Sequence, residues 1–275
     1  MRGFFAVLTT YHLVEFIRPA DRGACSPFVG RGVKLGGDAQ ADLFVKTRAG
    51  YGNRQAAAGV ELFTTLLARE FSLHAPEPAI AVIPERFSHL VLKAPEHAAL
   101  IAQSEGENFA TLSLGPDWKT LIAGHPPHAF PEDLMEDILI FDALVQHTDR
   151  ESLNPNLLWK GREIALLDHE GCFAHVPRFL ASTHPWRDYL GIRPLTRHCL
   201  FPEGRRLAHR PDFGRSFRER AISFEFTLHH HAFAECAGEA FPASKVVLAQ
   251  IVGYLDSVFR QFADFLELVK LNLSA

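Results

Sequence analysis

The sequence predicts an α+β protein with two lobes, of which the first is rich in β-strands and the second is mainly helical. In the first third of the chain, short apolar runs are bounded by glycines, which is typical of antiparallel strands joined by tight turns. Beyond the Gly115-Pro116 break, apolar residues recur mainly at helical spacing. We therefore expect a single domain whose lobes comprise residues 1–114 and 115–275.

The composition is that of an ordinary folded protein. Hydrophobic residues make up 47% and charged residues 22% of the 275 residues. The apolar run at residues 4–8 is too short for a secretion signal, and no stretch approaches the ~20 apolar residues that span a bilayer. We expect a cytoplasmic protein that does not enter the membrane. The four cysteines form no C-x-x-C pair, which favours reduced structural thiols over disulfides or a zinc site.

The strand-rich lobe is predicted to contain several strands and one helix. Residues 26–29 and 42–46 are short apolar runs flanked by glycines, as in neighbouring antiparallel strands. Residues 54–71 carry apolar side chains at steps of three and four, which predicts a helix. Prolines follow this helix, and residues 79–83 and 89–92 are predicted to form further strands.

The helical lobe is predicted to begin with a well-defined helix at residues 131–146. Pro131 suits the first turn, acidic residues follow near the positive end of the helix dipole, and one apolar stripe continues along it. Near the C-terminus, Ser244 is a suitable cap for a long core-facing helix that breaks near Gly253. Between these helices, residues 156–159 and 163–167 are predicted to pair as a hairpin through a turn at Gly161.

Three polar residues flank this hairpin. Antiparallel pairing brings its outer ends together, so Asn154, which enters it, and Asp168, which leaves it, are expected to lie close to each other. Phosphoryl transfer needs such a group, because metal ions on the phosphates prefer hard oxygen ligands and the attacking hydroxyl needs a carboxylate. Asn154 and Asp168 suit the metal, and Asp149 suits the hydroxyl. The alternative is that the three residues only cap a structural hairpin.

Phosphoryl transfer also needs a cation on the nucleotide phosphates and a carboxylate that holds this cation in place. Lys46 ends the strand predicted at residues 42–46, and Glu61 lies in the following helix. We expect these two side chains to pair, with Glu70 as the second choice of partner. Taken alone, Lys46 would be an ordinary lysine of an edge strand.

Four short motifs in the chain together resemble the HipA-like kinases, particularly the compact members that contain little beyond the kinase core. The resemblance covers roughly residues 20–175. It implies a protein-kinase-like fold, ATP with Mg²⁺ as cofactors, and transfer of phosphate to a serine or threonine of a protein. The motifs are Leu43-Phe44-Val45-Lys46, the helix start Gly52-Asn53-Arg54, Asp149 followed by Asn154-Pro155-Asn156-Leu157-Leu158, and Leu166-Leu167-Asp168-His169. By motif position, the resemblance makes Lys46 the phosphate-contacting lysine, Asp149 the catalytic aspartate, and Asn154 and Asp168 the metal ligands.

The sequence departs from related kinases at three places. His169-Glu170 follows the metal-binding aspartate, where ordinary protein kinases have Phe-Gly. The glycines near residues 30–37 do not form G-x-G-x-x-G, so the phosphate-binding turn is assigned to residues 23–26. Larger HipA proteins carry an additional N-terminal subdomain and act as toxins beside an antitoxin. Only about twenty residues precede the first predicted strand of the kinase, so we expect this chain to lack that subdomain, and a toxin role and an antitoxin-like regulatory partner are hypotheses.

An arginine-rich segment follows the predicted site. Residues 178–220 contain ten arginines and four acids, a net charge of +6 within a chain whose total is -4. We expect Arg205, Arg206 and Arg210 to dock an acidic or phosphorylated protein substrate, whereas direct nucleic-acid binding is not expected. The alternative is a solvated face whose arginine stems cover apolar surface. The histidine run at residues 229–231 lacks the spacing of a metal site and is interpreted as solvated or core histidines.

Two other functions remain open on the residues alone. The pattern His147-x-Asp149-x-x-x-x-Asn154 also resembles small-molecule kinases such as the aminoglycoside phosphotransferases, and Asp149-Arg150 with Asp168 is similar to phosphatidylinositol kinases. The acceptor is then a small molecule or a lipid. In the other alternative, the fold is a non-catalytic kinase-like interaction module.

Overall fold

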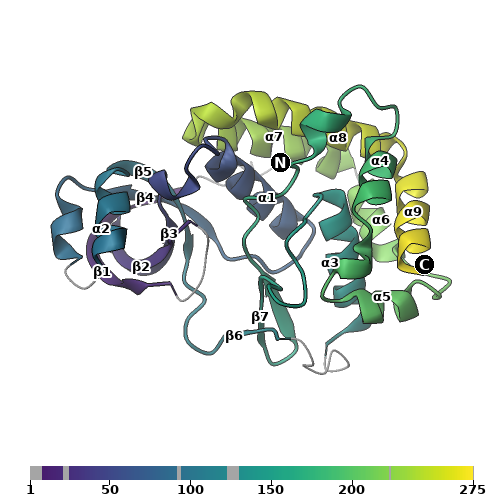
Figure 1. Ribbon diagram of the computed structural model, residues 1–275, viewed down its shortest axis with the longest axis horizontal. Coiled ribbons are helices and arrows are strands. Elements are labelled where there is room, and N and C mark those ends of the chain that lie inside the picture. The colour runs from purple at the N-terminus through teal and green to yellow at the C-terminus, as the bar shows by residue number, and fades with distance from the viewer. Residues whose placement is uncertain (1–7, 21–24, 92–93, 123–129, 223, 275) are drawn as a thin grey trace.

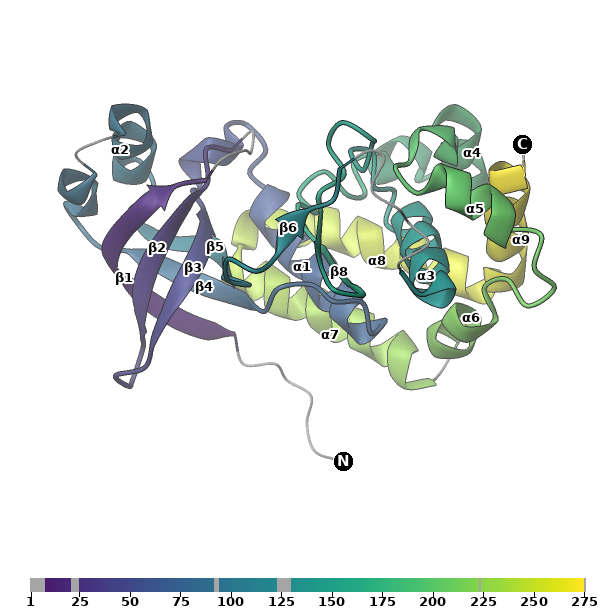
Figure 2. The same ribbon diagram turned by 90° about the horizontal axis from the view of Figure 1, so that it is seen from below.

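The computed structural model describes residues 8–20, 25–91, 94–122, 130–222 and 224–274. It has a β-rich N-terminal region and a helical C-terminal region, which lie at opposite ends of the long axis (Figures 1 and 2). The predicted mixed α+β organisation is therefore confirmed. Most of the run at residues 4–8, and residues 23 and 24 of the predicted phosphate-binding turn, lie outside the described residues.

Five strands of the N-terminal region close into a barrel with the order β1-β2-β3-β5-β4. The barrel consists of β1 (Thr9–Pro19), β2 (Phe28–Lys34), β3 (Gln40–Lys46), β4 (Pro78–Ile83) and β5 (Gly106–Leu112). The antiparallel pairing predicted for β2 and β3 is confirmed. Closure comes from the parallel pairing of β1 with β4, which joins Thr9 to Ala79 and His12 to Val82. The barrel therefore encloses a small core of its own, which includes Leu13, Phe28 and Leu43.

The helices form the second region, together with a small sheet of β6 (Lys119–Thr120), β7 (Leu157–Lys160) and β8 (Glu163–Leu166). Both views place this sheet between the barrel and the C-terminal helices (Figures 1 and 2). These helices are α1 (Ala57–Glu70), α3 (Glu132–Leu144), α4 (Pro185–Ile192), α5 (Phe201–Leu207), α6 (Arg215–Ala221), α7 (Phe224–Ala240), α8 (Lys245–Arg260) and α9 (Phe262–Ser274). Helix α2 (Pro95–Ala102) instead lies at the barrel end of the molecule, where Ile101 joins the barrel core. Among the residues that the structure describes, no helix combines the length and apolar content that a membrane span requires.

Helix α1 packs into the large core of the helical region. Its side chains Phe63 and Leu67 are fully buried in the same cluster as Phe141 of α3 and Val258 of α8. Close approach to the C-terminal helices requires a glycine in α1, because a Cβ added to Gly59 would lie 2.1 Å from the Ser244 hydroxyl oxygen. This packing fixes the position of α1 relative to the rest of the helical region.

Two local predictions are wrong. Residues 87–90 form a 3₁₀ helix instead of the predicted strand, because Arg86 adopts a left-handed conformation with φ 62° and turns the chain after β4. The C-terminal helix breaks at Gln261, not at Gly253, because the backbone of Gln261 leaves the helical region at φ −128° and ψ 36°. The remaining predicted elements are present, with ends that differ from the predicted ones by at most five residues.

The proposed division at residues 114 and 115 stays a prediction. β5 ends at Leu112, and Gly115 has φ 84°, so the chain turns there.

Candidate active site

A buried lysine ammonium forms the centre of the candidate site. Lys46 is the last residue of β3, and its Nζ lies 2.8 Å from Oε2 of Glu61 on α1. The same Nζ lies 2.6 Å from Oδ1 of Asp168, which follows β8. The pairing of Lys46 with Glu61 agrees with the geometry expected from the sequence. The second choice, Glu70, instead pairs with His229 at 2.6 Å.

Burial and charge act in opposite directions on the groups of this centre. Burial lowers the pKa of Lys46, but the Glu61 and Asp168 carboxylates outweigh it and hold this pKa well above its usual value. Burial raises the pKa of Glu61 to about 7, although Lys46 opposes the shift. The Lys46 ammonium is therefore charged at neutral pH. The pKa of Glu61 lies close to neutral pH, so a change in the neighbouring charges shifts its ionisation.

Glu170 is a third carboxylate of the centre, and no sequence motif predicted a role for it. Its Oε2 lies 3.1 Å from Lys46 Nζ, and its Oε1 lies 2.7 Å from Nη2 of Arg54, just before α1. The Cys25 thiol lies 3.1 Å from both oxygens of Glu170. Burial and Glu170 raise the pKa of Cys25 to about 12, so this thiol is protonated and donates. Glu170 therefore links the turn between β1 and β2 to the segment that follows β8.

A buried histidine connects Asp168 to Asp149. His147 Nε2 lies 3.1 Å from the Asp168 carbonyl oxygen, which only accepts, so Nε2 carries the proton. His147 Nδ1 accepts from the Asp149 backbone N–H at 3.3 Å. Burial, helped by the Arg150 charge, lowers the pKa of His147 to about 3, so the ring is neutral at physiological pH. His147 thus fixes the backbone of Asp149 relative to that of Asp168, and the Asp149 side chain is exposed.

A second buried group holds the loop that carries Asp149. Arg150 Nε lies 2.5 Å from Oδ2 of Asp142 on α3, and His198 Nε2 lies 2.9 Å from the same oxygen. Arg150 Nη1 also donates to the carbonyl oxygens of Pro155, at 3.2 Å, and Asn156, at 2.7 Å. Burial raises the pKa of Asp142, but Arg150 and His198 outweigh burial and hold this pKa well below its usual range. The loop between α3 and β7 is therefore fastened to a charged group inside the core.

The predicted hairpin is present, and its ends lie side by side. β7 and β8 pair from Leu157 with Leu166 to Lys160 with Glu163. The Leu167 N–H donates to the Asn156 carbonyl oxygen at 3.0 Å, which extends the pairing toward Asp168.

Asn154 lies on the exposed loop before this hairpin, where its N–H donates to the Glu151 carbonyl oxygen at 3.0 Å. Within the described part of the chain, no hydrogen bond joins the Asn154 side chain to Asp168. The metal-ligand role of Asn154 stays a prediction.

The three arginines predicted to dock the substrate lie on and just after α5. Arg206 Nη1 lies 2.5 Å from a carboxylate oxygen of Glu132, and Arg210 Nη1 lies 3.0 Å from one of Asp133. Both acids belong to the first turn of α3, so these two guanidiniums have partners within the chain. Arg205 is exposed. The docking role of the three residues stays a prediction.

The interpretation of residues 229–231 as solvated or core histidines also stays a prediction. His230 is fully buried, and its Nε2 lies 2.9 Å from Asp256 on α8, while His231 Nε2 lies 3.3 Å from the same carboxylate oxygen.

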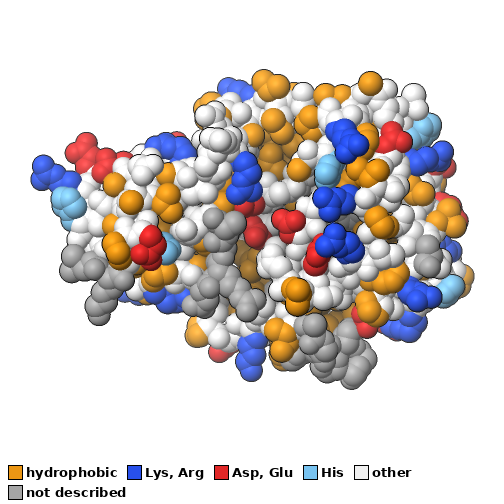
Figure 3. All heavy atoms as spheres, in the orientation of Figure 1, with side chains coloured by type: hydrophobic (Ala, Val, Ile, Leu, Met, Phe, Trp, Pro, Cys, Tyr) orange, Lys and Arg blue, Asp and Glu red, His pale blue; other side chains and the backbone are white. Residues whose placement is uncertain are grey.

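Acidic side chains gather in the middle of the face shown in Figure 3, in the recess between the barrel and the helices, with basic side chains beside them. A carboxylate-rich centre with a single buried lysine, formed by β3, α1 and the hairpin, is the kind of site that a phosphotransferase uses.

The family described as HipA-like kinase matches residues 13–184, which is more than half of the chain. The chain belongs to the HipA-like kinase family, as the motif resemblance predicts, and it is therefore a kinase by family. Searches of curated proteins and of solved structures find no match.

Proposed function

We propose that this chain is an ATP- and Mg²⁺-dependent serine/threonine protein kinase with a protein-kinase-like fold, whose lobes comprise residues 1–114 and 115–275. The observation that carries the proposal is the convergence of Lys46, Glu61 and Asp168. These residues come from three elements spread over more than 100 positions of the sequence, and they hold an ammonium between carboxylates where nucleotide phosphates would need it.

The donor groups suit magnesium and a nucleotide. Lys46 and Arg54 face the three carboxylates of Glu61, Asp168 and Glu170, which leaves one negative charge without compensation when all five groups are ionised. Carboxylate oxygens are the hard ligands that Mg²⁺ prefers. Asp168 and Asn154 would hold the metal, and Lys46 would contact the phosphates. When bound, Mg²⁺ would neutralise the charge that develops on the transferred phosphoryl group.

The residues of the chain supply the acceptor chemistry. Asp149 would orient the acceptor hydroxyl and take its proton, and neutral His147 would keep the Asp149 backbone in place beside Asp168. The exposure of Asp149 supports a serine or threonine presented by another protein over an acceptor enclosed in a deep pocket. An antitoxin-like regulatory partner remains a hypothesis that rests on family membership.

We expect Mg-ATP to stabilise the wild-type protein and to lose this effect when Lys46 is replaced by Met. A ligand at ~100 times its Kd adds ~2.7 kcal/mol to the free energy of unfolding, which corresponds to a rise of roughly 5–10 °C in Tm for a chain of this size. Without the Lys46 ammonium the phosphates lose their buried cation, so the rise should largely disappear. The measurement is thermal unfolding of each protein with and without Mg-ATP.

Each variant serves as its own reference in this measurement, so a change in intrinsic stability does not obscure the result. Lys34→Met is the matched control, because Lys34 ends the neighbouring strand β2 and is exposed. It should show the full rise. If Mg-ATP fails to stabilise the wild type, the chain is better described as a kinase-like interaction module.

A further inference from the structure

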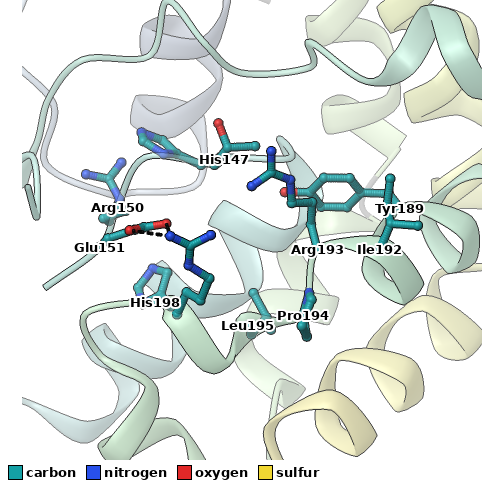
Figure 4. A pocket seen from close by; sticks show the side chains of 11 residues that line it. His147, Arg150, Glu151, Tyr189, Ile192, Arg193, Pro194, Leu195 and His198 are labelled. Atoms are coloured by element: carbon teal, nitrogen blue, oxygen red, sulfur yellow. Dashed lines mark hydrogen bonds and ion pairs between the residues drawn. The ribbon is translucent and has the colours of Figure 1, made fainter.

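A pocket of about 140 Å³ opens beside the loop that carries Asp149 (Figure 4). One side is formed by residues 147, 148, 150 and 151 of that loop, and the other by residues 189, 192–195, 197 and 198, which run from α4 toward α5. A water molecule needs only ~10–15 Å³ measured in this way, so the pocket has room for a side chain. The family match ends at residue 184, so the α4 side lies outside it.

Arginine side chains make the pocket cationic. Arg193 is exposed, and in the described part of the chain no carboxylate lies within ion-pair distance of it. Figure 4 shows its guanidinium pointing across the pocket toward the side that carries His147. Arg150 is 1% exposed, and its Nη2 has no hydrogen-bond partner among the described residues. This Nη2 is itself inaccessible, so Arg150 contributes positive charge to the wall of the pocket and leaves the direct contact with an anion to Arg193.

A third arginine in the pocket is held by a weak pair. Arg197 Nη2 lies 3.0 Å from an oxygen of Glu151, but the two side chains are 65% and 35% exposed. Exposed ion pairs of this kind contribute little to stability. Arg197 is therefore able to turn from Glu151 to an incoming anion at small cost.

Apart from its arginines, the side of the pocket that runs from α4 toward α5 is mainly apolar. Tyr189, Ile192 and Leu195 line it, and Ile192 is 46% exposed. A ligand with a short apolar stem and an anionic end fits both walls at once. An acidic amino-acid side chain has this form, and so does a phosphorylated one.

The position of the pocket connects it to the acceptor. Asp149 stands between two residues that line the pocket, Thr148 and Arg150. Successive residues of an extended peptide are ~3.3–3.6 Å apart. A side chain in the pocket and the hydroxyl at Asp149 therefore belong to residues close together in one substrate segment.

We propose that this pocket binds the anionic side chain of an acidic or phosphorylated residue near the acceptor serine or threonine of a protein substrate, with Arg193 as its main ligand. The proposal rests on the proposed kinase function and assigns its substrate preference. Charge-assisted bonds from guanidinium to carboxylate or phosphate are strong and geometrically specific. Arg206 and Arg210 are less suited to this role, because both are paired with acids of α3.

The test uses the full chain and a set of serine peptides that differ at one neighbouring position, which carries Glu, phosphoserine or Gln. Phosphorylation of each peptide is measured with Mg-ATP, and binding of the same fluorescent peptides is measured by polarisation without nucleotide. We expect anionic peptides to exceed the Gln peptide in kcat/KM by about tenfold or more at one position. Arg193→Gln should remove most of this preference and leave the KM for ATP unchanged. Comparison of Glu with phosphoserine identifies which anion the pocket prefers.

Arg187→Gln is the matched control, because it removes the same charge from an exposed position of α4 that does not line the pocket. It should keep the preference. Phosphorylation that is equally fast for anionic and Gln peptides would overturn the pocket proposal and leave the kinase intact. Binding that depends on Arg193 without any phosphorylation would support the pocket and contradict the kinase. Binding of phosphatidylserine vesicles that depends on Arg193, without a preference for anionic peptides, would overturn the peptide proposal and show that the pocket binds a lipid headgroup.

Discussion

Replacement of Asp168 by Asn is expected to reduce phosphoryl transfer by roughly 10²–10³-fold or more, while the protein without ligands keeps the stability of the wild type. Loss of one positioned electrostatic group at a transition state typically has an effect of this size. Asn is the least disruptive replacement, because Asp168 has φ 61° and Asn is among the few residues that adopt this conformation readily.

Stability should survive this change for an electrostatic reason. Lys46 retains Glu61 and Glu170 as partners when the Asp168 charge is removed. Asp168 also contributes to the raised pKa of Glu61, so its removal eases the repulsion between these carboxylates. The measurements are steady-state transfer and thermal unfolding without nucleotide.

The same pair of measurements separates the proposed role from a purely structural one. If Asp168 only caps the hairpin, Asp168→Asn should lower Tm. Its activity should then fall only in proportion to the fraction of protein that is unfolded. Asp42→Asn is the control. Asp42 is also an aspartate with an ion pair, but it is exposed, lies four residues before Lys46 on β3 and pairs with Arg31 of β2. Its activity should match that of the wild type.

Replacement of Arg150 by Met is expected to destabilise the fold by about 3–5 kcal/mol, because it leaves the buried Asp142 carboxylate without its main partner. For a chain of this size the expected fall in Tm is on the order of 10 °C. Thermal or urea unfolding measures the effect. Arg31→Met is the control, since Arg31 pairs with acids on the exposed surface of the barrel, and it should change Tm little.

The Arg150 effect should depend on pH in a defined direction. The folded-state pKa of Asp142 lies below its unfolded value, so the pair contributes stability above pH ~4 and loses it as the pH falls further. In Arg150→Met, burial instead raises the Asp142 pKa, and the carboxyl is accommodated more easily when protonated. The difference in Tm between the two proteins should therefore be largest near neutral pH and should narrow toward pH 4. A difference that stays constant over this range would contradict the assignment to this charge pair.

Local patterns predicted the elements that carry the candidate site. The helix α3 and the β7–β8 hairpin follow directly from apolar periodicity and a glycine turn, and these signals are contained within about 15 residues. The pair of Lys46 and Glu61 was also predictable, because a strand followed by a helix limits where a partner for the lysine can lie.

Contacts between distant segments were not predictable in this way. Closure of the barrel depends on β1 pairing with β4, some 70 positions later, and no local pattern announces such a partner. Glu170 gains its role only when β8 brings it to Lys46 and Arg54. The buried pair of Arg150 and Asp142 was not predicted, because residues 147–152 around this arginine are all polar and give no sign of burial.

The most direct test of the proposed function is transfer of the γ-phosphate of labelled ATP, with Mg²⁺, by the wild type and by Asp149→Asn. Label is read on the protein itself and in a mixed protein and lipid extract. Asp117→Asn is the control, because it changes another exposed aspartate, which pairs with Lys160 away from Asp149. We expect the wild type and the control to label protein, and Asp149→Asn to lose this labelling by roughly 10²–10⁴-fold, with Mg-ATP binding retained. Label found only on lipids or small molecules would show that the acceptor is not a protein. Equal labelling of protein by wild type and Asp149→Asn would contradict the catalytic role assigned to Asp149.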